Sequence, residues 1–202
     1  MKRVIKPRRN RGSEERRRHI IETALKCFSE KGYVNTTVED IRIRSGASTG
    51  SIYYHFKSKE QLAMAVYVQG ILDYQEGMLE TLEMAASARD GIWAMVRYHL
   101  NWVTVRADWS RYLFQMRNAG FMADAEQTIC AANKRFAQGI GDFFRKQHIA
   151  GAVRSLPVEL YIALILGPCQ EYARQIVSHP CPVNPDTAIS EIAEGAWRAI
   201  RK

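Results

Sequence analysis

The sequence predicts an all-α protein that is divided into a small N-terminal domain and a larger C-terminal helical domain. Apolar residues recur at three- and four-residue steps along most of the 202 residues, and no stretch keeps the alternating pattern of a strand. Capping residues and glycines mark where helices begin and end. The excess positive charge gathers near the N-terminus. From these observations we expect a basic flexible arm over residues 1–12, one domain over 13–60 and a second over 61–202.

The small domain is expected to contain short helices that follow one amphipathic helix. The first helix should begin near Ser13, and Gly32 supplies its stop. Short helices this close together are unstable singly, so they must share a core. The capping signals that mark them are Thr37-x-x-Asp40, Gly46, Ser48 and Ser58, with the third helix running through Phe56. The candidate core residues are Leu25, Phe28, Val38, Ile41, Ile52 and Phe56.

Two of these helices are joined by Ser45-Gly46-Ala47-Ser48 and flanked by basic residues. A tight turn between two short helices is typical of the helix-turn-helix arrangement. After it the predicted helices lengthen. They are expected over residues 59–84, 88–106, 108–117, 123–147, 157–178 and 185–201.

The charge is unevenly distributed. The formal net charge is +8, yet residues 1–60 hold 15 Lys and Arg against 7 Asp and Glu, whereas residues 61–202 hold 14 of each. The whole excess therefore lies in the first 60 residues. A concentrated positive field beside a neutral domain indicates binding to a polyanion such as DNA. The alternative is a basic segment that only improves solubility.

Several classes of protein are excluded or disfavoured. The four cysteines, at positions 27, 130, 169 and 181, show no C-x-x-C pairing, which argues against a disulfide framework or a metal site. No cofactor fingerprint and no nucleophile–base pair is recognisable. The longest apolar run, Val158 to Cys169, is too short to span a bilayer, and no apolar signal core follows the basic N-terminus. We expect a cytoplasmic protein without a membrane partner.

Residues 36–62, TTVEDIRIRSGASTGSIYYHFKSKEQL, together with the preceding helix that ends in FSEKGY, resemble the DNA-binding domain of the TetR family of transcriptional regulators. The resemblance covers about the first 60 residues closely. It implies a homodimer that binds double-stranded DNA at a palindromic operator. It also implies that a small-molecule inducer enters the larger domain and releases the DNA, which makes the protein most plausibly a repressor and not an enzyme.

One residue departs from the family pattern. A small residue usually follows the apolar residue of the second helix, where the two helices of the motif cross, but here Arg42 follows Ile41. Either the stem of Arg42 lies along the helix edge with its guanidinium in solvent or on phosphate, or the helices cross at a wider distance.

The DNA-contacting residues are expected on the third helix and at its borders. Small residues in its first turn let the backbone approach base edges, and hydroxyl groups can bind either kind of base. Packing in the core is the alternative for one of the two tyrosines, a neutral surface histidine for His55, helix capping for Thr37 and plain solvation for Arg44. The expected contacts are Thr37, Arg44, Ser48, Thr49, Gly50, Ser51, Tyr53, Tyr54, His55 and Lys59. By resemblance, Tyr53 and His55 face DNA, and Lys59 contacts its backbone.

The larger domain is expected to bind the inducer and to form the dimer. Its many aromatic and Met residues can line a cavity for a partly apolar ligand, such as an aromatic compound or a fatty acyl derivative, although ordinary core packing is the alternative for each. The ligand candidates are Trp93, His99, Trp102, Gln115, Met116, Arg135, Phe136, Glu171 and Tyr172. The dimer candidates on the last two helices are Tyr161, Leu164, Ile165, Ala188, Ile192, Ala196 and Trp197.

Two other functions compete with this interpretation. A helical enzyme for a hydrophobic substrate is disfavoured, because no catalytic constellation is present. A ligand carrier that has lost DNA binding is the other alternative, and Arg42 is the feature that favours it.

Overall fold

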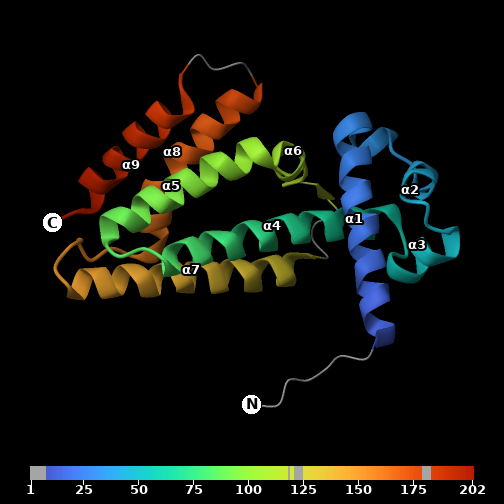
Figure 1. Cartoon of the computed structure of the whole chain (residues 1–202), viewed down its shortest axis with the longest axis horizontal. Helices are drawn as coiled ribbons and strands as arrows, with labels where there is room; N and C mark the ends of the chain where they lie inside the picture. The colour runs from blue at the N-terminus through green and yellow to red at the C-terminus, as the bar shows by residue number, and fades with distance from the viewer. Residues whose placement is uncertain (1–7, 118, 121–124, 179–182) are drawn as a thin grey trace. The chain divides into compact units, whose positions relative to one another are not determined.

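The computed structural model describes residues 8–117, 119–120, 125–178 and 183–202. Within these residues the regular structure is α-helical, apart from an isolated β-bridge between Val153 and Arg201. The all-α prediction is confirmed. The helices shown in Figure 1 are α1 (Arg8–Asn35), α2 (Val38–Ser45), α3 (Thr49–His55), α4 (Lys59–Glu83), α5 (Ala88–Val105), α6 (Ala107–Met116), α7 (Glu126–Ile149), α8 (Val158–Ser178) and α9 (Pro185–Ile200).

The chain divides into two compact units. The first comprises Met1–Gly70 and Arg111–Ala125, and the second comprises Ile71–Ser110 and Glu126–Lys202. α4 and α6 therefore each contribute residues to both units. Where the sequence predicts one boundary near residue 60, the division by contacts falls within these two helices instead.

The helix ends follow the predicted capping signals closely. Gly46 ends α2 in the left-handed conformation, with φ 61°, and Ser48 caps α3 through its side chain. Gly32 also has a positive φ of 77° and interrupts the helical dihedral angles of α1, although a further turn continues to Asn35. The main difference is at the start of α1, which begins at Arg8 and not near Ser13. The arginines of this stretch are good helix formers and need no apolar contact to continue a helix.

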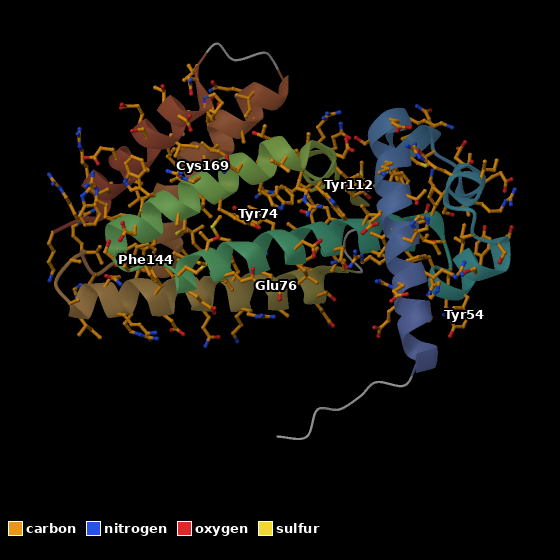
Figure 2. The ribbon with its side chains drawn as sticks, viewed as in Figure 1. Tyr54, Tyr74, Glu76, Tyr112, Phe144 and Cys169 are labelled. Atoms are coloured by element: carbon orange, nitrogen blue, oxygen red, sulfur yellow. The ribbon has the colours of Figure 1, made fainter. Side chains whose placement is uncertain are left out.

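The first unit is built around the apolar face of α1. Of the six predicted core residues five are buried and Val38 is half-buried. Tyr112 of α6 completes this core, because its ring stacks on Phe28 at a centroid distance of 5.6 Å. Its hydroxyl donates to the carbonyl of Ala63 in α4 at 2.9 Å. α6 therefore closes the core of the first unit (Figure 2).

The second unit is a helical bundle in which α5 packs against α8 and α9, and α8 packs against α7 and α9 (Figure 1). Its core contains the stacked rings of Phe144 and Tyr161, whose centroids are 4.4 Å apart. α7 approaches α4 at Gly139, where an added Cβ would lie 2.6 Å from Leu79. The absence of a side chain at Gly139 therefore allows the two helices to pack closely here.

Candidate nucleic-acid interface

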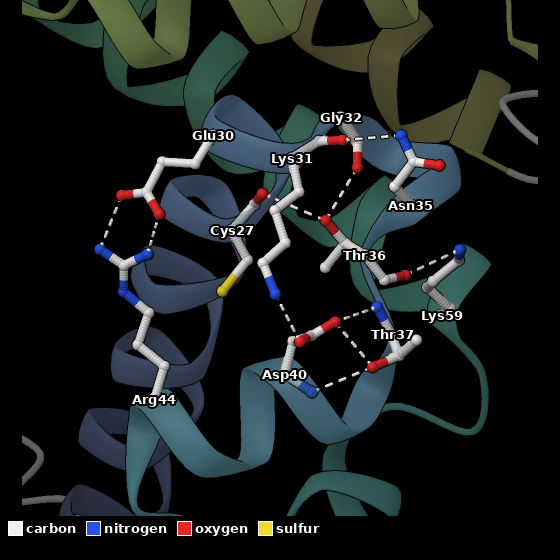
Figure 3. Close-up of polar contacts among 10 residues, drawn as sticks. All are labelled: Cys27, Glu30, Lys31, Gly32, Asn35, Thr36, Thr37, Asp40, Arg44 and Lys59. Carbon is white, nitrogen blue, oxygen red and sulfur yellow. Dashed lines mark hydrogen bonds and ion pairs between the residues drawn. The ribbon is translucent and has the colours of Figure 1, made fainter.

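The turn that leads into α2 is held by a reciprocal set of hydrogen bonds. Thr37 accepts from the backbone N–H of Asp40 at 3.1 Å, while the backbone N–H of Thr37 donates to the Asp40 carboxylate at 2.8 Å. The ammonium of Lys31 donates to the same carboxylate at 2.6 Å, and these donors hold the pKa of Asp40 far below its usual range. Capping, one of the alternatives weighed for Thr37, is thus what its side chain does (Figure 3).

The C-terminal end of α1 is held by Thr36 and Lys59. The fully buried hydroxyl of Thr36 donates to the carbonyls of Cys27 and Gly32, at 3.1 and 2.8 Å. The ammonium of Lys59 donates to the carbonyls of Tyr33 and Thr36, both at 3.0 Å, and to that of Val34 at 3.4 Å. It also lies 4.5 Å from the centre of the Tyr33 ring. Lys59 therefore ties α4 to α1, and the contact with DNA that we expect of it stays a prediction (Figure 3).

Two arginines of α2 are engaged within the first unit. Arg44 donates to both carboxylate oxygens of Glu30, one of them at 2.8 Å, and thereby lowers the pKa of Glu30. Arg42 donates to both oxygens of Glu39 at 2.7 Å. The first alternative for Arg42 is thus the observed one, since its guanidinium lies at the helix surface and pairs one turn away.

α3 presents most of its predicted contacts to solvent. Its apolar side is buried through Ile52, and Phe56 is buried directly after it. On the other side Tyr53 and Tyr54 are exposed, by 48% and 80% of their surface, so neither belongs to the core. Figure 2 shows the position of Tyr54. The remaining predicted contacts on this helix and its cap are exposed or half-buried. They are Ser48, Thr49, Gly50, Ser51 and His55.

His55 lies in a positively charged environment. Burial lowers its pKa below the ordinary value of 6.5, and the charges of Arg17 and Arg16 lower it further. The imidazole is therefore neutral at pH 7, and it can donate one hydrogen bond and accept another. Arg17 also lies over the Phe56 ring, 5.3 Å from its centre.

A hollow of about 590 Å³ lies between α3 and the N-terminal part of α1. Gly12, Ser13 and Arg16 line it on the α1 side, opposite Ser51 and Tyr54. The sequence analysis did not single out these α1 residues, because it expected the DNA contacts on the third helix and at its borders, and the closeness of α1 to α3 depends on tertiary packing. The signal available in the sequence was the triplet Arg16-Arg17-Arg18, which places positive charge on the first helix. The hollow can hold a phosphate group against a guanidinium and hydroxyl groups.

The ligand candidates of the second unit are brought together in part. The hydroxyl of Tyr74 and Nδ1 of His99 are 2.7 Å apart, and the Tyr74 ring contacts the rings of Trp102 and Phe136. Burial lowers the pKa of His99 to about 4, so its imidazole is neutral near pH 7. Trp93 and Trp102 line a groove of about 570 Å³ along α5.

The other ligand candidates lie elsewhere. Gln115 and Met116 belong to the first unit, and Arg135 is exposed on α7. Glu171 is exposed and accepts two hydrogen bonds from Arg174, while Tyr172 donates weakly, at 3.4 Å, to the carbonyl of Val183. None of these five side chains is among the residues that line the groove along α5.

The dimer candidates are distributed between core and surface. Leu164, Ile192 and Trp197 are half-buried and remain available for contact. The other four pack inside the second unit, because the apolar stripes of α8 and α9 face α5 and each other. These four are Tyr161, Ile165, Ala188 and Ala196. The exposed side of α8 instead carries Leu160 and Ala163.

Two other kinds of site were sought across the described ranges. In them no group of three His, Cys, Asp or Glu side chains is arranged to hold a metal ion. Nor is any helix of those ranges long and apolar enough to cross a bilayer.

Comparison with known proteins bears on this geometry. Residues 20–66 match the family model described as bacterial regulatory proteins, tetR family. The chain is 31% identical over 109 residues to the transcriptional repressor AcnR of Corynebacterium efficiens, covering 48% of this chain and 50% of AcnR. It is 29% identical to a transcriptional repressor of Mycobacterium tuberculosis, over 75% of this chain and 78% of that protein. The chain thus spans half or less of the length of several curated relatives that it matches.

Solved structures share the fold over nearly the whole chain. The regulator FadR from Bacillus subtilis, in complex with stearoyl-CoA, matches with a TM-score of 0.75 at 19% identity, over 89% of this chain and 96% of its own. A regulator from Saccharomonospora viridis, in complex with choline, matches with a TM-score of 0.73 at 23% identity, over 94% of this chain and 99% of its own.

Proposed function

Given that the chain belongs to the TetR family of bacterial regulatory proteins, we propose that it is a ligand-responsive repressor in the cytoplasm, where it binds a palindromic operator as a homodimer. The observation that carries this proposal is the exposed side of α3, which presents hydroxyl groups and two tyrosines beside a neutral histidine. A helix of this kind fits the major groove, where its N-terminal residues contact base edges. The protein is thus a transcription regulator and not an enzyme.

Specific and non-specific contacts fall on different residues in this proposal. Thr49 and Ser51 lie in the first turn of α3 and contact bases. Arg16 and Ser13 of α1, together with Tyr53 and His55, contact phosphates on the flanking backbone. Few groups read the bases directly, so DNA shape and the repetition of the half-site supply much of the specificity.

A dimer is part of the proposal because two reading helices must sit about one DNA turn apart, roughly 34–36 Å. We propose the exposed sides of α8 and α9 as the seam, with Leu164, Ile192 and Trp197 from the expected set and Leu160 added by its 47% exposure. A two-fold dimer explains why the operator is a palindrome, since each half-site meets the same surface.

Release by a small molecule is the third part of the proposal. The aromatic side chains of the second unit offer apolar surface for a ligand, and similar folds hold stearoyl-CoA and choline. A ligand that favours one arrangement of the dimer by about 1–3 kcal/mol weakens DNA binding by roughly one to two orders of magnitude.

The test begins with selection of bound sequences from a random duplex library by the full-length protein. Fluorescence anisotropy with the selected duplex then measures affinity across a salt series. We expect a palindromic site, two protomers per duplex and a steep fall of affinity with salt. Selection of no common sequence, or a salt-independent affinity, would contradict the proposal.

Two pairs of variants assign the roles. Thr49→Ala should change base preference, whereas Thr187→Ala, an exposed threonine of α9, should not. Arg16→Gln should weaken binding to every duplex and lower the salt slope by about one, whereas Arg18→Gln, whose guanidinium pairs with Glu22, should have little effect. Equal effects of Thr49→Ala and Arg16→Gln on all duplexes would show that base and phosphate contacts are wrongly assigned.

A further inference from the structure

An open groove runs along α5 in the second unit, and Thr81 of α4 lines one side of it. Its volume is about 570 Å³, within the range of roughly 300–1,000 Å³ usual for ligand sites. We call it the aromatic groove and define it by six of the residues that line it. They are Trp93, Ala94, Arg97, Tyr98, Asn101 and Trp102.

The shape of the aromatic groove follows from the sequence of α5. Residues three and four positions apart lie on one side of a helix, so Ala94, Tyr98 and Asn101 follow one another along the groove. Ala94 leaves a low point because its side chain is a single methyl group. The larger rings of Trp93, Tyr98 and Trp102 rise around it. Flat rings along a shallow groove suit a planar aromatic body, which can stack on them or meet their edges.

A polar group at the aromatic groove lacks a partner. The indole N–H of Trp93 is buried and makes no hydrogen bond within the described part of the chain. A buried donor without an acceptor is destabilising, and a ligand oxygen can supply the missing acceptor. The protein itself covers this N–H, so a ligand oxygen pairs with it once the indole turns towards the groove.

The charges at the groove indicate the kind of oxygen. Arg97 and Arg106 line the groove, and neither makes an ion pair with another residue in the described ranges. The single carboxylate of the lining, Asp90, accepts from the hydroxyl of Ser87 at 2.7 Å as part of the N-terminal cap of α5. Two guanidiniums without an ion-pair partner favour a carboxylate ligand, which guanidinium binds with paired hydrogen bonds.

Two further carboxylates of α4, Asp73 and Glu80, lie near Tyr98 and raise its pKa, although burial of the ring is the larger cause. They do not line the groove. Their charge disfavours an anion beside the α4 wall, so the carboxylate belongs on the side of Arg97.

We infer that the aromatic groove binds a planar aromatic carboxylate, with its ring on Trp93, Tyr98 and Trp102 and its carboxylate on Arg97. The binding itself is independent of DNA. Its effect on the operator rests on the proposed function, since it names the class of inducer for that response.

The experiment uses three probes with one ring system: 2-naphthoate, the neutral 2-naphthamide and the cationic 2-naphthyltrimethylammonium. Calorimetric titration of the full-length, DNA-free protein measures each affinity. We expect 2-naphthoate to bind about tenfold more tightly than the amide, which is the worth of one charge-assisted contact at a partly exposed site. The cationic probe should bind most weakly.

Three variants locate the site. Arg97→Gln should remove most of the preference for the carboxylate, while Arg111→Gln, an exposed arginine outside the groove, should keep it. Trp93→Phe keeps a ring and removes the N–H, so 2-naphthoate should bind a few-fold more weakly. Ala94→Leu fills the low point of the groove and should abolish binding of all three probes, with circular dichroism confirming that the fold is retained.

Each outcome decides a separate point. Equal affinity for the three probes, or a preference for the cation, would overturn the carboxylate assignment. Binding that Ala94→Leu leaves intact would overturn the site. If 2-naphthoate binds as expected but leaves operator affinity unchanged, the inferred site stands and the ligand response in the proposed function fails.

Discussion

The two compact units differ in how completely their buried polar groups are paired. In the first unit the hydroxyl of Thr36 donates to two carbonyls, and the ammonium of Lys59 donates to three. In the second unit three buried side-chain atoms have no hydrogen-bond partner within the described residues: Nε1 of Trp93, Nε2 of His99 and Oγ of Ser110. No such atom occurs among the described residues of the first unit.

This difference suits each unit to a different task. A fully paired polar network fixes a single geometry, as a surface that must match DNA requires. Unpaired buried groups lower the stability of the ligand-free state, and a ligand that pairs with them recovers that free energy. The first unit is thus suited to hold a fixed surface for DNA, and the second is suited to bind and release a ligand.

Lys59→Met tests the network of the first unit most directly. The change keeps the apolar stem but removes the ammonium that binds the end of α1, and we expect the free energy of unfolding to fall by about 3 kcal/mol. Urea unfolding followed by circular dichroism measures this, and Lys57→Met, at an exposed lysine, is the control. A loss below about 1 kcal/mol would mean that Lys59 serves DNA binding and not the fold.

The buried histidine of the second unit should make its stability depend on pH. Because burial lowers the pKa of His99 from 6.5 to about 4, the unfolded chain binds more protons between these values. Stability is therefore complete above about pH 6.5 and is lost as the pH falls towards 4. We expect the free energy of unfolding to be about 2 kcal/mol lower at pH 5 than at pH 7.

Variants assign this pH dependence. His99→Gln should remove it, whereas His19→Gln, at an exposed histidine of α1, should leave it in place. Unfolding curves at pH 5 and pH 7 for the three proteins make the comparison. A slope that persists in His99→Gln would show that other groups cause it.

Thr36→Val tests a satisfied hydroxyl of the first unit. Valine has the same shape, but it leaves the carbonyls of Cys27 and Gly32 without this donor, and we expect a loss of about 1.5 kcal/mol in the free energy of unfolding. The matched control is Thr104→Val in α5, an exposed residue whose hydroxyl donates to the carbonyl of Leu100 at 2.9 Å. Similar losses in the two variants would remove the distinction on which the contrast depends.

Ser110→Ala tests the opposite case in the second unit. The hydroxyl of Ser110 is buried without a partner, so its removal should raise the free energy of unfolding by about 0.5–1 kcal/mol. Ser155→Ala, at an exposed serine, should change it by less than about 0.5 kcal/mol. Destabilisation by Ser110→Ala would reveal a bound partner for this hydroxyl.

Local signals in the sequence were sufficient to predict the helices, including α3. The capping box at Thr37, the left-handed Gly46 and the cap at Ser48 each act within a few residues, and each is present as predicted. Both tyrosines of α3 are exposed, so neither packs in the core, and their contact with DNA stays a prediction. Contacts of this kind depend on backbone geometry that neighbouring residues determine, so one sequence is enough to find them.

Only the tertiary structure shows which side chains already make hydrogen bonds or ion pairs within the fold. Lys59 reaches carbonyls 23 to 26 residues away, Arg44 of α2 pairs with Glu30 of α1, and Arg16 of α1 lines the hollow beside α3. The tertiary structure also shows that Tyr161 and Ile165, two of the dimer candidates, are buried within the second unit. An apolar stripe shows that a helix covers something, but whether its own unit or a partner covers it depends on packing between distant segments.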